Sequence, residues 1–235
     1  MAAKRPPVVL ISGQLCTERL WREQVPALEA LTDVAVSVQR DHDNIGAMAK
    51  TILASQPERF SIIAHAMGGF VAFEVLRQAP HRVAGLALLS TLASADTPVQ
   101  TTRRKGYLRL VEAGKFAGIV EERIPILLHP ARRGDEVLVS VVRKMAEDTG
   151  PDVFLRQQRA IMTRPDSRQG LGAITCRTLI LFARQDGIVT LEDQKEMSEG
   201  IPGARLEIIA DCGHLMTLER PQLVTQILAD WIAAT

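Results

Sequence analysis

Residues 60–70 run from an apolar strand pattern into a helical pattern through one short turn. The turn contains His65 and Ala66, and the residues two before and two after Ala66 are the small Ala64 and Gly68. Such a turn holds its central residue in a strained backbone conformation, and small neighbours let the strand and the helix approach each other. The start of the helix directs amide groups and the positive end of its dipole at a group held above the turn. The segment could therefore hold a reacting oxygen.

This turn resembles the nucleophile elbow Gly-x-Ser-x-Gly of the α/β-hydrolase fold, in the variant small-His-Ser-Met-Gly-Gly. The matching residues are Ala64-His65-Ala66-Met67-Gly68-Gly69. The resemblance implies a catalytic serine where this chain has Ala66, whose methyl group cannot attack a carbonyl. We favour a serine-to-alanine substitution in an otherwise intact motif. The alternatives are a natural pseudoenzyme that binds a ligand without cleaving it, and an unrelated strand–helix turn.

Two later loops carry residues that the resemblance assigns to the same site. Asp186 follows the apolar run Leu179–Phe182, as in the family's Gly-x-x-Asp loop, with Ala183 in the place of the glycine. His214 follows the run Leu206–Ile209 and matches the family's Gly-His after the last strand. The chain order is then nucleophile, acid, base. The resemblance implies that Asp186 orients His214, which takes a proton from the serine and delivers it to the leaving group.

Two other carboxylates compete with Asp186 for the role of the acid. Asp211 is too close to His214 in the sequence and lies in the wrong loop. Asp96 follows the fourth predicted strand, where some relatives place the acid. We prefer Asp186 because its strand–loop context and its chain order match the family. His65 is expected to pack and to hydrogen-bond within the elbow rather than to act as a base.

Acyl transfer also needs an oxyanion hole, formed by two N–H groups that face the developing negative charge. The resemblance implies that the N–H of Met67, directly after the nucleophile position, is one donor. The second donor is expected in the loop after the first strand, where Gln14 is preferred and Leu15 is the alternative. Ser12 stands in this loop where family members often have a histidine that anchors it. The residues predicted to contact the substrate are Leu15, Trp21 and Met162.

The elements that must position these residues form an alternation of short apolar runs and helical patterns, which is typical of a parallel sheet built from βαβ units. Most runs are continuously apolar, as expected for strands that are covered on both faces. Strands are predicted at Val8–Ile11, Val34–Val38, Phe60–Ala64, Val83–Leu89, Thr178–Phe182 and Leu206–Ile209. Helices are predicted around Trp21–Leu28 and at Ile45–Ser55, Met67–Gln78 and Pro221–Ile232. The fold class is α/β, specifically an α/β-hydrolase fold with a mostly parallel sheet flanked by helices.

The alternation stops between about residues 94 and 172, where no strand is apparent and the connection is too long for an ordinary loop. We expect residues 1–93 and 172–235 to form the hydrolase core and residues 94–171 to form a helical cap inserted after the fourth strand. Helical pieces in this region are predicted at Arg103–Glu112, Val137–Glu147 and Val153–Ile161.

The predicted cap contains more basic than acidic residues, with 14 Lys and Arg against 10 Asp and Glu between residues 95 and 170. A solvated helical surface explains such an excess. The alternative is a pocket mouth that favours an anionic or carboxylate-bearing substrate. The arginines considered as carboxylate anchors are Arg103, Arg104, Arg132, Arg133, Arg156 and Arg159.

Composition excludes several other classes of protein. The 235 residues carry 28 Lys and Arg and 27 Asp and Glu, a balance that argues against nucleic-acid and membrane partners. The chain has 3 Cys without a CxxC pair, so neither a disulfide framework nor a metal site is expected, and no cofactor is implied. No apolar stretch approaches the ~18 residues of a membrane span. We expect a cytoplasmic monomer or homodimer with a small-molecule substrate.

The resemblance implies a serine hydrolase that cleaves an ester, amide, lactone or thioester of a small to medium substrate through an acyl-enzyme. With Ala66 the chain is expected to be inactive or nearly so. The alternatives are a ligand-binding receptor built on this scaffold and a carbon–carbon hydrolase or lyase that uses the same triad. Dehalogenases and epoxide hydrolases of this fold use an aspartate nucleophile, against which the serine-like motif argues.

Overall fold

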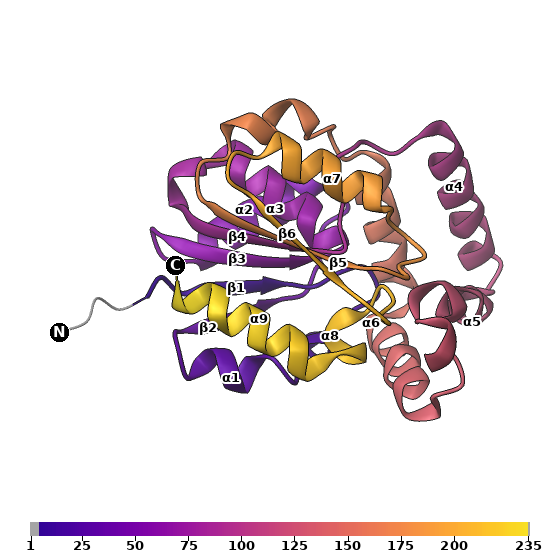
Figure 1. Cartoon of the computed structure of the whole chain (residues 1–235). Helices are drawn as coiled ribbons and strands as arrows, with labels where there is room; N and C mark the ends of the chain where they lie inside the picture. Colours follow the sequence, from indigo (N-terminus) through magenta and orange to yellow (C-terminus); the bar gives the residue numbers. More distant parts are fainter. Residues whose placement is uncertain (1–4, 235) are drawn as a thin grey trace.

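The computed structural model describes residues 5–234, and Figure 1 shows a single parallel sheet with helices on both faces. Residues 1–4 and 235, which include both ends of the predicted hydrolase core, lie outside the described residues. The strand order of the 6-stranded sheet is β2-β1-β3-β4-β5-β6, and every neighbouring pair is parallel. The strands are β1 (Val8–Ile11), β2 (Val34–Ser37), β3 (Phe60–His65), β4 (Val83–Leu89), β5 (Arg177–Ala183) and β6 (Arg205–Ile209).

The helices divide between the two faces of the sheet. One face carries α2 (Ile45–Ser55), α3 (Met67–Gln78) and α7 (Leu191–Gly200), and the other carries α1 (Val25–Glu29), α8 (Met216–Glu219) and α9 (Pro221–Ala233). Alternate residues of one strand enter different cores, since Val8 and Leu10 pack on the α9 side and Val9 and Ile11 pack on the α2 side. The strands are therefore covered on both faces, which explains why their sequences are continuously apolar.

The helical insertion, residues 94–171, joins β4 to β5 and contains no strand. It forms α4 (Pro98–Glu112), α5 (Phe116–Leu127) and α6 (Glu136–Met162), which pack on one another at the carboxyl ends of the strands (Figure 1). Apolar side chains of α5 and α6, among them Ile124 and Val142, belong to the same core cluster as strands β1, β4 and β5. The insertion is thus fixed on the core by buried apolar contacts, while its role as a cap stays a prediction.

Several predicted helices differ from those observed. The first helix is instead a 3-10 turn at Glu18–Trp21 followed by α1. The predicted pair within α6 is continuous and bends at Gly150, whose φ of 77° is not helical. Helix α4 begins at Pro98, before the predicted start, because Thr97 provides a capping box for its first turn. Helices α5 and α7 were not predicted, and Pro125 within α5 weakens its helical signal.

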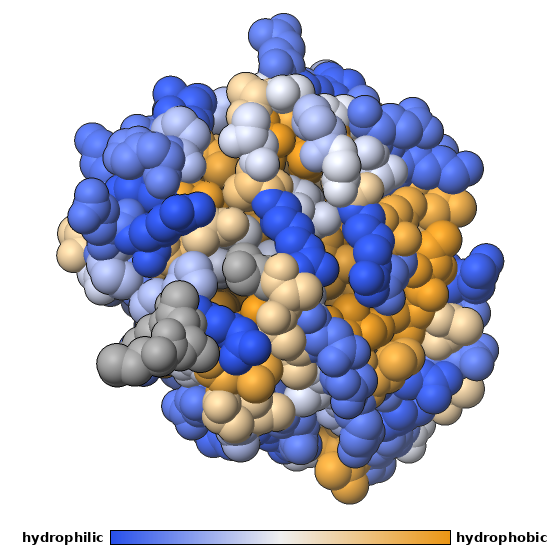
Figure 2. All heavy atoms as spheres, turned by 60° about the vertical axis from the view of Figure 1, so that its left-hand side comes forward, coloured by the Kyte–Doolittle hydropathy of each residue, from blue (hydrophilic) through white to orange (hydrophobic). Residues whose placement is uncertain are grey.

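In the described part of the chain, no helix has the length and apolar character needed to cross a bilayer. Figure 2 turns the left-hand side of Figure 1 forward and shows hydrophilic side chains spread over this face, with apolar atoms visible between them. The candidate functional residues lie at the other end of the sheet, since each follows the carboxyl end of a strand.

Candidate active site

Ala66 occupies the turn between β3 and α3 with φ of 50° and ψ of −114°. A residue with a Cβ atom rarely adopts this left-handed backbone conformation, so the surrounding structure must hold it there. Its N–H donates to the carbonyl of Leu89 at 2.9 Å, and its own carbonyl accepts the hydroxyl of Thr91 at 2.7 Å. The last residue of β4 and the loop that follows it therefore hold the strained turn.

Close approach of the helix explains the two glycines after the turn. A Cβ atom on Gly68 would lie 2.4 Å from the carbonyl oxygen of Ile11, and one on Gly69 would lie 2.2 Å from Oγ1 of Thr91. Both distances are far below contact distance, so only glycine allows α3 to start this close to β1 and β4. The predicted elbow geometry is present although the nucleophile position holds an alanine.

The loops after β5 and β6 bring an acid and a histidine together. Nδ1 of His214 lies 2.8 Å from Oδ2 and 3.0 Å from Oδ1 of Asp186. A carboxylate accepts only, so Nδ1 carries the proton and Nε2 of His214 is left as the basic nitrogen. His214 lines the same cavity as Ala66. The structure thus brings the predicted acid, base and nucleophile position to one site.

Asp186 is held in its ionised form despite burial. Burial raises the pKa of this carboxyl, but the charge of His214 and its hydrogen bond, together with the N–H of Ile188 at 2.7 Å, lower it by more. The net result is a pKa below the usual range for an aspartate. Asp186 can therefore stabilise an imidazolium form of His214.

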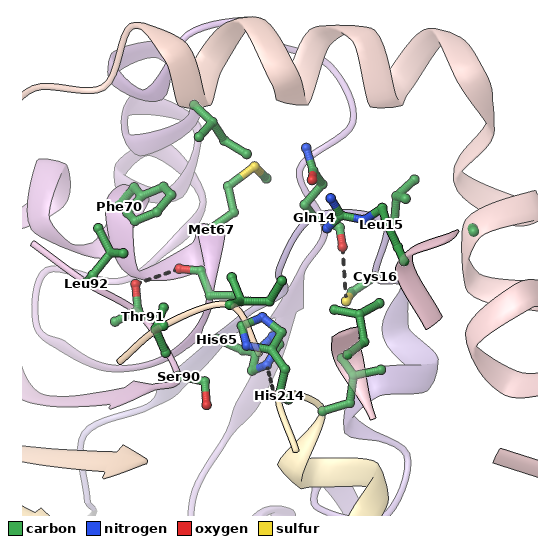
Figure 3. A pocket seen from close by; sticks show the side chains of 18 of the residues that line it. Gln14, Leu15, Cys16, His65, Met67, Phe70, Ser90, Thr91, Leu92 and His214 are labelled. Atoms are coloured by element: carbon green, nitrogen blue, oxygen red, sulfur yellow. Dashed lines mark hydrogen bonds between the residues drawn. The ribbon is translucent and has the colours of Figure 1, made fainter. Parts of the chain in front are cut away.

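His65 packs beneath His214, with the two ring centroids 4.9 Å apart (Figure 3). Its Nε2 donates to the carbonyl oxygen of His214 at 2.9 Å. Burial and, to a smaller extent, the nearby His214 together lower the pKa of His65 to about 3. A histidine that stays neutral and donates to a backbone carbonyl positions the His214 loop and cannot serve as a base at neutral pH.

The C-terminal end of α5 holds both loops. The N–H of His214 donates to the carbonyl of Leu127 at 2.9 Å, and a Cβ atom on Gly187 would lie 2.5 Å from the carbonyl oxygen of Ile126. The buried carboxylate of Glu219 accepts the N–H of Gly213 at 3.1 Å. Its second oxygen accepts the N–H of His129 at 2.8 Å, so Glu219 links the histidine loop to the insertion.

The two predicted oxyanion donors line the cavity on opposite sides (Figure 3). Within residues 5–234, no hydrogen-bond acceptor is found for the backbone N–H of Met67 or Gln14. The alternative donor Leu15 is committed elsewhere, because its N–H donates to Oε1 of the buried Gln157 at 3.1 Å. Leu15 does line the cavity through its side chain.

Two of the predicted substrate contacts are wrong. Trp21 is fully buried in the core and does not line the cavity, and its Nε1 donates to Oγ of Ser12 at 3.0 Å. The indole therefore anchors the loop after β1, which the absent histidine would do in relatives. Met162 also lies off the cavity, because helix α6 turns Ile161 toward it instead.

The two other carboxylates considered for the role of the acid, Asp96 and Asp211, interact with arginines instead of His214. Asp96 is buried and accepts hydrogen bonds from Arg104 at 3.0 Å and from Arg164 at 2.8 Å. Burial raises its pKa, but the two guanidinium groups lower it by more. Asp211 pairs with Arg220 at the surface, at 3.4 Å. Neither carboxylate hydrogen-bonds to His214.

The cavity at this site has a volume of about 90 Å³, space for roughly six to nine water-sized groups at about 10–15 Å³ each. Its charged lining consists of four arginines and no aspartate or glutamate: Arg103, Arg104, Arg123 and Arg164. Arg103 and Arg104 were among the carboxylate anchors considered from the sequence, whereas Arg123 and Arg164 were not. A signal for Arg123 was present, since it shares a helical stripe with Val120 and Leu127, where a charged residue is unusual.

A parallel sheet that carries a strained turn and an acid–histidine pair at the carboxyl ends of its strands defines the α/β-hydrolase class. Comparison with known proteins agrees, since the sequence model of the Alpha/beta hydrolase family matches residues 9–227. The chain belongs to this family.

Among solved structures, a malate-bound thermophilic esterase from Thermogutta terrifontis is similar, with 28% identity and a TM-score of 0.89 over 97% of this chain and 90% of that chain. The pimeloyl-[acyl-carrier protein] methyl ester esterase of Photobacterium profundum is 26% identical over 96% of this chain and 94% of its own length. A Klebsiella pneumoniae protein provisionally named carbamate hydrolase RutD is 27% identical over 97% and 92%.

Proposed function

We propose that this chain is a serine hydrolase scaffold whose nucleophile position is occupied by Ala66, so that it binds substrate but does not turn it over. The observation that carries the proposal is the hydrogen bond between Asp186 and His214, which fixes the basic Nε2 of a histidine that lines the cavity with Ala66. A binding protein would have no need of this oriented base beside a strained elbow.

With a serine at position 66, the site supports acyl transfer. His214 takes the hydroxyl proton as the serine oxygen attacks the substrate carbonyl, and the N–H groups of Met67 and Gln14 stabilise the oxyanion. The imidazolium, stabilised by Asp186, then protonates the leaving group, and water releases the acyl-enzyme by the same route in reverse. The helical insertion closes over the site as its cap.

The bond that is cleaved is proposed to be an ester or a closely related acyl bond. Two of the similar proteins reported above are named esterases, and the third is provisionally named a carbamate hydrolase. The volume of the cavity favours a small substrate rather than a long acyl chain. The chemistry needs neither a metal nor an organic cofactor.

The test is the variant Ala66→Ser, assayed against short activated esters, amides, lactones and thioesters. Loss of one triad member lowers the rate by about 10⁴- to 10⁶-fold, so the serine should raise hydrolysis by a comparable factor. Ala66→Gly is the matched control, because it changes the same position without supplying a nucleophile. A folded Ala66→Ser protein that cleaves none of these substrates contradicts the proposal and favours the alternative hypothesis of a natural pseudoenzyme.

A further inference from the structure

The arginines of the cavity outnumber the acids that could neutralise them. Arg104 and Arg164 share a single carboxylate, that of Asp96, at 3.0 and 2.8 Å. This group keeps one positive charge in excess. In the described part of the chain, Arg103 and Arg123 form no salt bridge with an acidic residue.

Arg123 is the arginine that lies inside the cavity without a counter-ion. It is on α5 between Val120 and Leu127, both of which line the cavity. Its Nε is buried and has no hydrogen-bond partner. The guanidinium lies over the ring of Tyr107, at 5.9 Å from the ring centroid, which positions it without neutralising it.

The charge on Arg123 persists in this setting. Burial lowers the pKa of Arg123, and the interaction with Tyr107 opposes the shift. The neighbouring charged groups that act on it are Arg103 and Arg104, which are also cations. A guanidinium stays protonated under nearly all conditions, so the cavity holds a cation that has no anionic partner among residues 5–234.

A second unpaired donor lines the same cavity. Nε2 of Gln14 is buried without a hydrogen-bond partner. Gln14 is also the residue whose backbone N–H is proposed as an oxyanion donor. Buried polar groups without partners are uncommon. Nε of Arg123 and Nε2 of Gln14 therefore both indicate a ligand that supplies hydrogen-bond acceptors.

We propose that Arg123 binds a free carboxylate of the substrate, so that the preferred substrates are short acyl compounds with a second, ionised carboxyl group. This inference rests on the proposed function for the identity of the reacting bond. One unpaired guanidinium matches one negative charge, and the cavity encloses about six to nine non-hydrogen atoms of a ligand. Arg103, which is exposed, attracts the anion at the mouth.

The test is binding to the chain with Ala66, because this form does not consume the ligand. Isothermal titration calorimetry compares monomethyl glutarate, which carries one carboxylate, with the neutral dimethyl glutarate. The monoester should bind about 10- to 100-fold more tightly, the range expected for a charge-assisted hydrogen bond. Monomethyl malonate, succinate and adipate give the preferred chain length.

Three variants assign this preference to a residue. Arg123→Gln should abolish the preference for the anion, so that the monoester and dimethyl glutarate bind with similar affinity. Arg123→Lys should restore part of it, because the charge returns without the planar fork. Arg109→Gln is the control, since Arg109 is an exposed arginine of α4 that does not line the cavity.

Equal affinity for the two esters, no measurable binding of any monoester at millimolar concentration, or a preference that survives in Arg123→Gln overturns the inference. The result is separable from the proposed function. If Ala66→Ser cleaves neutral activated esters while no anion preference is found, the hydrolase proposal stands and the carboxylate site fails. If the preference is found while Ala66→Ser is inactive, the carboxylate site stands and the hydrolase proposal fails.

Discussion

The cavity has two walls that differ in how their charged groups are paired. On the wall formed by the loops after the strands, the carboxylate of Asp186 is matched to His214 at 2.8 Å and to backbone N–H groups. On the wall formed by the helical insertion, the guanidinium of Arg123 has no acidic partner in the described chain. We propose that the difference separates two tasks: the residues at the ends of the strands determine which reaction is possible, and the insertion selects the substrate.

The largest effect is expected on the sheet wall. In the Ala66→Ser background, Asp186→Asn should lower kcat by about 10⁴-fold, because an asparagine amide favours the wrong tautomer of His214. The shape of the loop is kept, so binding of the substrate should change little. The measurement is a steady-state assay with an activated ester, and Asp193→Asn in α7 is the control. A loss of less than tenfold would contradict the pairing that defines this wall.

The next effect compares two arginines of the insertion wall. Arg164 is almost completely buried and pairs with Asp96 at 2.8 Å. Arg164→Met removes one of the two guanidinium groups that neutralise this carboxylate. The variant should therefore lower the free energy of unfolding by about 3 kcal/mol. Arg123→Met removes a cation that has no acidic partner, so it should change the free energy of unfolding by less than about 1 kcal/mol.

Urea unfolding at pH 7 measures both changes through the midpoint at constant m value. Equal losses in the two variants would remove the distinction between a structural arginine and a ligand-binding one. Arg123→Met and Arg123→Gln both remove the charge. Calorimetry and urea unfolding of these two variants therefore show whether a loss of anion binding occurs without a loss of stability.

The two walls also differ in how far the sequence predicted them. The elbow, Asp186 and His214 follow apolar strands, and the carboxyl ends of parallel strands meet at one edge, so chain order alone places these residues together. The position of Arg123 depends on which face of α5 turns inward, and packing against α4 and α6 determines that face. The prediction for Trp21 failed for a similar reason: its hydrogen bond to Ser12 depends on a tertiary contact.

The smallest effect tests whether the sheet wall keeps its second histidine neutral. His65 has a pKa of about 3 in the folded chain, against 6.5 for an ordinary histidine. Between these values the unfolded chain binds a proton that the folded chain does not, so stability is full above pH 6.5 and falls as the pH decreases. At about 1.4 kcal/mol per pH unit, His65 should account for a loss of about 2 kcal/mol between pH 7 and pH 5.

His65→Gln has no titrating group at this position and should show a correspondingly flatter dependence, even though its stability at pH 7 is lower. Urea unfolding at pH 7, 6 and 5 gives the difference, and His81→Gln is the control because His81 lies in the turn before β4, away from the site. Parallel pH profiles for the chain with His65 and for His65→Gln would mean that His65 takes up a proton in the folded state. The sheet wall would then also hold a cation without an acidic partner, next to His214, and the contrast between paired and unpaired charges on the two walls would disappear.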